Sequence, residues 1–102
     1  AMLKKGQQIN VADESGDTAV HKAARRGDKA FVLQLLKFGA VGDHADNDGV
    51  TPVMIAVSYG LTELVEELVS KGASLLAVTK DGATLLHTAV YSGHEETVRA
   101  LL

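Results

Sequence analysis

The chain has 102 residues, a net charge of −3 at neutral pH and no cysteine, which excludes disulfides, thiolate catalysis and cysteine-ligated zinc. No apolar run approaches the roughly 18 residues that a membrane span requires, and the opening residues, AMLKKGQQ, lack the apolar core of a signal peptide. We therefore expect one soluble domain with an intracellular location, cytoplasmic or nuclear, and without membrane insertion.

The charge is distributed unevenly along the chain. Residues 1–45 hold seven Lys and Arg against five Asp and Glu, whereas residues 46–102 hold three against eight. One interpretation is an ordinary solvated surface. The other is a basic patch near Lys22, Arg25, Arg26 and Lys29 that attracts an acidic partner. Because the chain as a whole is acidic, we expect no specific binding of nucleic acid.

An internal repeat dominates the sequence. Comparing the chain with itself at an offset of 33 residues aligns identical residues in three successive copies. The aligned columns are Gly6, Gly39 and Gly72; Gly16, Gly49 and Gly82; Thr18, Thr51 and Thr84; Ala23, Ala56 and Ala89; Gly27, Gly60 and Gly93; Val32, Val65 and Val98; and Leu35, Leu68 and Leu101. Composition alone does not produce so many threefold matches at one spacing, so the chain is a structural repeat.

Each copy begins with a glycine turn, ESGD, NDGV or KDGA, in which a positive φ allows the backbone to reverse. The threonine that follows is placed to cap a helix, and the next residues are apolar or small at helical spacing. The first helices are predicted over residues 19–26, 52–59 and 85–92. A glycine follows each of them in a position suited to a left-handed C-cap.

A second helix is predicted in each copy, over residues 29–38, 62–71 and 95–102. Apolar residues recur there at intervals of three and four, and Gly39 and Gly72 end the first two of these helices. One copy cannot cover its own apolar face, so neighbouring copies must stack. The sequence therefore predicts an all-α repeat fold, an α-solenoid of helix-turn-helix units.

The segments DTAVHKAARRGD and DGATLLHTAVYSGHEE resemble ankyrin repeats, whose pattern is G-x-T-P-L-H-x-A-A-x-x-G-H followed by an apolar helix and G-A. The resemblance covers the whole chain and implies an ankyrin-type stack joined by β-hairpin-like loops. It divides the single domain, residues 1–102, into the end of a preceding repeat (3–12), two repeats (13–45 and 46–78) and an incomplete repeat (79–102). The proline of the pattern is present only as Pro52, and Met54 replaces its histidine in the middle copy.

The histidines are the first candidates for metal or acid–base chemistry. The resemblance implies that His21 and His87 instead brace the fold by hydrogen bonds to the backbone and to the motif threonines. Met54 at the equivalent position supports this reading, because a reactive residue would not alternate between copies of a repeat. His44 lies in the variable return loop and is expected to be solvated.

Other catalytic templates fail. His94 begins HEET, but the zinc-protease motif H-E-x-x-H needs a second histidine where Val98 stands. The chain has no G-x-S-x-G elbow and no phosphate-binding glycine loop. The pairs Glu66-Glu67 and Glu95-Glu96 are neighbours on helices and point roughly 100° apart. We therefore expect no enzyme, no catalytic or metal-binding residues and no cofactor.

The resemblance implies that a partner binds the concave face, through the turn tips and the exposed side of the first helices. The tips supply Glu14, Ser15, Asp17, Asn47, Asp48, Val50, Lys80, Asp81 and Ala83. The helices supply Arg25, Arg26, Ser58, Tyr59, Tyr91 and Ser92. Equivalent positions in successive copies form two rows, which bring both tyrosines of the chain beside two arginines.

Tyrosine and arginine dominate interface hot spots, so we expect Tyr59 and Tyr91 to anchor a protein or peptide and Arg25 and Arg26 to pair with its acidic groups. The alternative is that the tyrosines pack beneath a loop. The predicted function is a protein–protein interaction module or scaffold. Two other functions remain open: an architectural spacer that self-associates through exposed end repeats, and the targeting arm of a larger enzyme.

Overall fold

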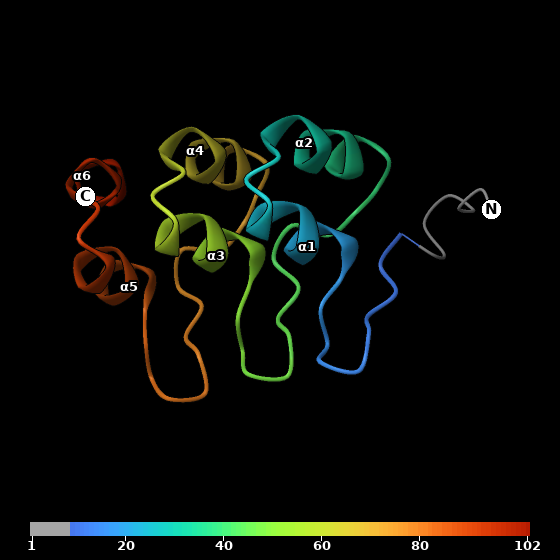
Figure 1. Cartoon of the computed structure of the whole chain (residues 1–102), viewed down its shortest axis with the longest axis horizontal. Coiled ribbons are helices and arrows are strands. Elements are labelled where there is room, and N and C mark those ends of the chain that lie inside the picture. Colours follow the sequence, from blue (N-terminus) through green and yellow to red (C-terminus); the bar gives the residue numbers. More distant parts are fainter. Residues whose placement is uncertain (1–8) are drawn as a thin grey trace.

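The computed structural model describes residues 9–102 and shows three successive pairs of short helices. In chain order they are α1 (Ala19–Arg25), α2 (Lys29–Lys37), α3 (Pro52–Ser58), α4 (Thr62–Ser70), α5 (Leu85–Ser92) and α6 (Glu95–Leu101). The first helices of the pairs form one row and the second helices form another (Figure 1). No β-strand occurs among the described residues, so the predicted all-α solenoid is confirmed.

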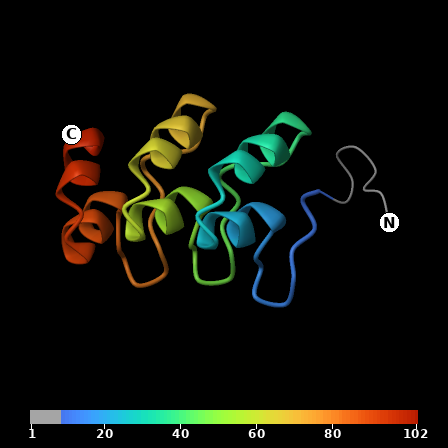
Figure 2. The same ribbon diagram turned by 45° about the horizontal axis from the view of Figure 1, so that its top comes forward.

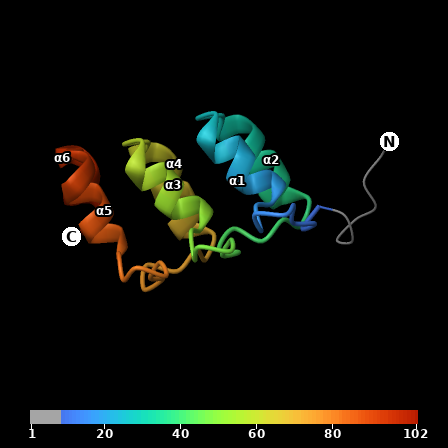
Figure 3. The same cartoon turned by 60° about the horizontal axis from the view of Figure 1, so that its bottom comes forward.

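Extended loops project from the first helices at the start of each repeat (Figures 1 and 2). The same two backbone hydrogen bonds close every loop; in the first, Asp13 N–H donates to the Asp17 carbonyl at 2.9 Å and Gly16 N–H to the Asp13 carbonyl at 2.9 Å. These are the hairpin-like turns expected from the sequence. When the loop side is brought forward, α1 and α3 lie in front of α2 and α4 (Figure 3).

Adjacent loops are joined edge to edge by backbone hydrogen bonds. The Asn47 N–H donates to the Ser15 carbonyl at 3.0 Å, and the Lys80 N–H donates to the Asp48 carbonyl at 2.9 Å. The packing is so close that a Cβ atom on Gly16 would lie 2.7 Å from the backbone nitrogen of Asn47. Glycine is therefore required at this turn for its positive φ of 82° and for space.

The predicted helix starts are confirmed. Thr18, Thr51 and Thr84 are the N-caps of the three first helices. The Oγ1 of Thr84 accepts the His87 N–H at 3.2 Å, and that of Thr51 accepts the Met54 N–H at 3.4 Å. These bonds satisfy backbone donors that have no partner within the helix.

The core runs without interruption from repeat to repeat. Ala23, Ala56 and Ala89 are at most 1% exposed and let neighbouring first helices approach closely. Val32 and Val65, one period apart on the second helices, are 0% and 2% exposed. Burying such a valine contributes about 1.5–3 kcal/mol, so the repeats depend on one another for stability.

Residues 3–12 are predicted to end a preceding repeat, and only residues 9–12 of that segment lie in the described part. Ile9 there is 5% exposed and joins the core. Within residues 9–102, none of the helices is both long enough and apolar enough to traverse a bilayer.

Candidate partner-binding surface

The turn tips (residues 14–17, 47–50 and 80–83) lie beside the C-terminal ends of α1, α3 and α5 (residues 25–26, 58–59 and 91–92). We call these residues together the tip-and-helix surface. The 33-residue period sets equivalent side chains next to one another. The backbone bonds between adjacent loops join the three tips into one continuous edge.

Each tip is held by the side chain that opens its turn. The Oδ1 of Asp13 accepts the N–H groups of Ser15 and Asp17 at 2.9 and 3.0 Å. The N–H of Asp17, then that of Ser15, and Lys22 together lower the pKa of the Asp13 carboxyl despite some opposing desolvation. Hydrogen bonds within the chain thus hold the first tip in this conformation.

Equivalent hydrogen bonds, from backbone N–H groups to the side chain that opens the turn, hold the second and third tips. The Oδ1 of Asp46 accepts the N–H groups of Asp48 and Val50, each at 2.9 Å. In the third tip the Oγ1 of Thr79 accepts the Ala83 N–H at 3.0 Å. Sequence reasoning missed this column, although a short polar side chain three residues before a turn glycine is typical of such turns.

Most of the predicted tip residues reach solvent. The exposed ones are Glu14, Ser15, Asn47, Asp48, Lys80 and Asp81. Val50 and Ala83 are half-buried, and Asp17 is buried. The side-chain amide of Asn47 also donates to the Glu14 carbonyl at 2.7 Å, so it links two tips.

The two predicted arginines differ in their surroundings. The Nη1 of Arg25 lies 2.6 Å from the Oδ2 of Asp17, and its Nη2 lies 3.9 Å from the Oδ2 of Asp46. The hydrogen bond to Asp17, with the charges of Asp17 and Asp46 and the phenol of Tyr59, raises the pKa of Arg25. Arg26 is exposed and has no ion pair within residues 9–102. Of the two arginines, only Arg26 thus lacks an ion pair within that range.

The tyrosines lie on the surface. Tyr59 is 52% exposed and Tyr91 is 94% exposed, so Tyr91 does not pack beneath a loop. Between the third tip and the ends of α3 and α5 lies a hollow of about 420 Å³, lined by Ser58, Ala83, His87, Thr88, Tyr91 and Ser92. Ser58 and Ser92 are half-buried at its edge. Of the predicted helix-end residues, Ser58, Tyr91 and Ser92 thus line one concavity, whereas Tyr59 is not among its lining residues.

His21 braces the first repeat against the second. Its ring is fully buried, and its Nδ1 accepts the Thr18 N–H at 3.0 Å, so its Nε2 carries the proton. The Nε2 donates to the Val50 carbonyl at 2.8 Å. The predicted bracing role is confirmed for this histidine.

Asp17, His21 and Asp46 place one ligand atom each within 4.8 Å of one another, a spacing compatible with a metal ion. The fold already uses these atoms, however: the Asp17 carboxylate binds Arg25 and the ring nitrogens of His21 are bonded as described. The donor set therefore belongs to the scaffold.

Two further histidines link elements. His44, expected to be solvated, is half-buried with its ring edge-on to that of His21 at a centroid distance of 6.1 Å. His44 is therefore only partly solvated, because its ring lies against that of the buried His21. The Nε2 of His94 donates to the Ser58 carbonyl at 3.1 Å and so ties the third repeat to the second.

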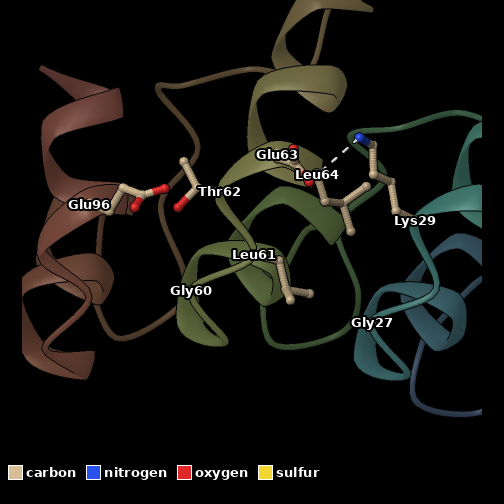
Figure 4. Close-up of a pocket in the computed structure, with 8 residues that line it drawn as sticks. All are labelled: Gly27, Lys29, Gly60, Leu61, Thr62, Glu63, Leu64 and Glu96. Atoms are coloured by element: carbon tan, nitrogen blue, oxygen red, sulfur yellow. Dashed lines mark ion pairs between the residues drawn. The ribbon is translucent and has the colours of Figure 1, made fainter.

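A second concavity of about 370 Å³ crosses the N-terminal ends of the second helices (Figure 4). Lys29 and Glu63 face each other there with a nitrogen-to-oxygen distance of 3.9 Å, and Glu96 extends from α6 toward Thr62. No residue of the tip-and-helix surface lines this groove. Among the described residues, Lys29 and Glu63 form the one ion pair of this groove, and Glu96 forms none.

Comparison with known proteins adds a family match. The family model described as ankyrin repeats (3 copies) matches the chain over two overlapping ranges, residues 1–79 and 43–102. Together these matches extend over the full length of the sequence. A comparison with curated proteins gives no match.

Proposed function

The chain belongs to the ankyrin repeat family, whose repeats are generally protein–protein interaction modules, and from this premise we propose that it binds a protein or peptide on the tip-and-helix surface. The preformed tips would act as a rigid template. Binding to such a surface loses little conformational entropy, which favours affinity.

The observation that carries the proposal is Tyr91, an aromatic side chain that is 94% exposed and held on a helix beside a concavity. Tyrosine supplies a large amphipathic contact area with few rotatable bonds, and it is enriched among hot spots. Tyr59, 52% exposed one repeat earlier, extends the contact along the row. We propose that these two tyrosines are the anchors.

Arg26 supplies the charge for recognition. Its guanidinium is exposed and unpaired among the described residues, and an acidic group of the partner would satisfy it. The guanidinium of Arg25, in contrast, donates hydrogen bonds to the carboxylate of Asp17 in the first tip. We therefore assign the acidic partner group to Arg26 rather than to both arginines.

Selection of peptides from a random library on the immobilised chain, followed by calorimetric titration, tests this proposal. Tyr91→Ala should weaken the selected peptides by tenfold or more, about 1.4 kcal/mol, and Arg26→Gln should weaken the acidic ones. Glu66→Gln on the exposed side of α4 is the matched control and should leave affinity unchanged. Peptides that bind the Tyr59→Ala/Tyr91→Ala double variant as well as the parent would exclude this surface.

The family is typically non-catalytic, and we propose no enzymatic activity for this chain. We also propose an intracellular location and a protein rather than a nucleic-acid partner, in keeping with the acidic net charge of −3. If the parent chain retained duplex DNA at physiological salt, the proposal of a protein rather than a nucleic-acid partner would be contradicted.

A further inference from the structure

Arg25 fills the space between α1 and the first two turn tips. Its Nη1 lies 2.6 Å from the Oδ2 of Asp17 on the first tip, and its Nη2 lies 3.9 Å from the Oδ2 of Asp46, which opens the second tip. The side chain therefore crosses from the end of a first helix to the boundary between two repeats. At this first boundary the fold itself holds a guanidinium.

The second repeat has no such side chain. Ser58 on α3 stands one period after Arg25, and its hydroxyl donates to the Ile55 carbonyl of its own helix at 2.8 Å. Ser58 and, on the third tip, Ala83 both line the hollow of about 420 Å³ described above. The place that an arginine fills at the first boundary is therefore open at the second.

A further hollow adjoins this one. Its volume is about 460 Å³, its lining residues come from the second and third tips, and Ala83 lines both hollows. Val50, which lies one period after Asp17, lines it. Thr79, which lies one period after Asp46, lines it as well. The further hollow thus corresponds to the place of the guanidinium at the first boundary, and we call the two hollows together the second-boundary groove.

The second-boundary groove lies inside the stack and not at one of its ends. Its lining residues belong to the second and third repeats, which are joined at the tips by the bond from the Lys80 N–H to the Asp48 carbonyl at 2.9 Å. The contacts between these two neighbouring repeats therefore leave the groove open.

Two carboxylates border the groove without a cationic partner. Asp48 and Asp81 line it, both are exposed, and neither forms an ion pair within residues 9–102. The Asp81 carboxylate accepts the Thr79 hydroxyl, which orients it. Lys80 is the one basic residue among the lining residues. Because residues 46–78 also contain five acidic residues and one basic residue, the local field favours a cation.

The helix side of the groove suits the rest of an arginine side chain. Ala83, Thr88 and Tyr91 line it and provide two methyl groups and an aromatic ring. Arginine packs its methylene stem on apolar surface and stacks its planar head on aromatic faces. The groove therefore combines surface for the stem with carboxylates for the charge.

We propose that the second-boundary groove receives an arginine side chain of the bound protein or peptide, as the first boundary holds the chain's own Arg25. This inference rests on the proposed function and adds the kind of residue that the partner supplies. The partner's guanidinium pairs with Asp48 and Asp81, and its stem lies against Ala83 and Tyr91. Since Arg26 takes an acidic group, the surface selects a segment that carries both charges.

The first test uses the chain alone. Ser58→Arg places an arginine on α3 where Arg25 stands on α1, and Ser58→Met is the uncharged control with a similarly long side chain. At low salt the arginine variant should unfold about 2–4 °C above the methionine variant, because its guanidinium gains the free carboxylates. The difference should disappear when Asp48→Asn/Asp81→Asn is added. An equal unfolding temperature for the two variants, or a difference that survives the loss of both carboxylates, would overturn the proposal.

The second test uses peptides selected from a random library on the immobilised parent and retained only if Tyr91→Ala weakens them. Each arginine in these peptides is replaced by citrulline, which keeps the shape and removes the charge. One replacement should weaken binding to the parent tenfold or more, and binding to Asp48→Asn/Asp81→Asn less than about twofold. Glu66→Gln, which removes a carboxylate from the exposed side of α4, should leave the tenfold effect intact.

The outcomes separate this inference from the proposed function. Peptides that depend on Tyr91 but tolerate citrulline at every arginine, or carry only lysine or apolar residues there, would overturn the arginine groove and leave the proposed function standing. If no peptide depends on Tyr91, the proposed function fails. The role of the groove in binding then fails with it, even where Ser58→Arg is stabilised.

Discussion

The Nε2 of His21 donates a 2.8 Å hydrogen bond to the carbonyl oxygen of Val50, across the boundary between the first and second repeats. His21 is 0% exposed, and Val50 is half-buried. Met54 occupies the equivalent position in the second repeat, and its thioether cannot donate to the next loop. The first repeat boundary thus contains a bond from a helix histidine to the next loop that the second boundary lacks.

His21→Met copies the second repeat into the first and should lower the free energy of unfolding by about 1 kcal/mol, the usual net contribution of one hydrogen bond. The Val50 carbonyl keeps the Asp46 N–H as a partner, which limits the loss. Urea unfolding followed by circular dichroism measures the change. His87→Met is the control, since its ring makes no such link within residues 9–102, and an equal loss in both variants would refute the idea.

Met54→His should strengthen the second boundary by up to about 1 kcal/mol. The carbonyl of Ala83 stands where that of Val50 stands one repeat earlier, and it accepts the Thr79 N–H as Val50 accepts that of Asp46. The midpoint of thermal unfolding gives the result, with Met54→Leu as a volume control. A histidine variant no more stable than the leucine variant would show that the ring cannot reach this carbonyl.

The sequence predicted the helices and their ends well because the signals for them are local. The column of Thr18, Thr51 and Thr84 marks the helix starts, and the glycine columns mark the ends. These residues act on their own backbone, so their spacing along the chain is sufficient to identify them.

The parts that the sequence did not predict depend on side-chain direction. The ion pair between Arg25 and Asp17, eight residues apart, was not predicted, because no periodic signal connects these two residues. His44 was expected in solvent, but the curvature of its loop brings it to His21. Distances between loops and helices of this kind follow from tertiary packing, which spacing alone does not encode.

We expect replacement of Arg25 to change the stability of the fold and replacement of Arg26 to leave it nearly unchanged. Arg25→Gln should lower the free energy of unfolding by up to about 1 kcal/mol, because its pair with Asp17 is partly open to solvent. Arg26→Gln should leave stability within about 0.5 kcal/mol, as expected for an exposed residue without a partner. Chemical denaturation of both variants measures this, and an equal loss in the two would contradict the assignment.

Gly60→Ala should destabilise the protein more than Gly93→Ala. Both glycines have positive φ, 69° and 76°, so each alanine would bear a backbone strain of about 1–2 kcal/mol. At Gly60 the added Cβ would also lie 2.5 Å from the Nδ1 of His94, whereas at Gly93 it would meet nothing within 4 Å. Thermal unfolding of the pair isolates the His94 contact, and equal losses would mean that the ring moves aside freely.

Asp13 should make stability depend on pH in acid. Its pKa in the folded chain is lowered, first by the hydrogen bond from the Asp17 N–H, so its contribution is fully present above the unfolded pKa of about 3.9 and is lost as the pH falls through the folded value. Asp13→Asn keeps an oxygen that can accept the turn hydrogen bonds but removes the charge. The stability difference between parent and variant should be constant near neutral pH and should shrink on acidification below about pH 4. Urea unfolding at a series of pH values measures it, and a difference that persists unchanged in strong acid would show that the charge of Asp13 does not hold the first tip.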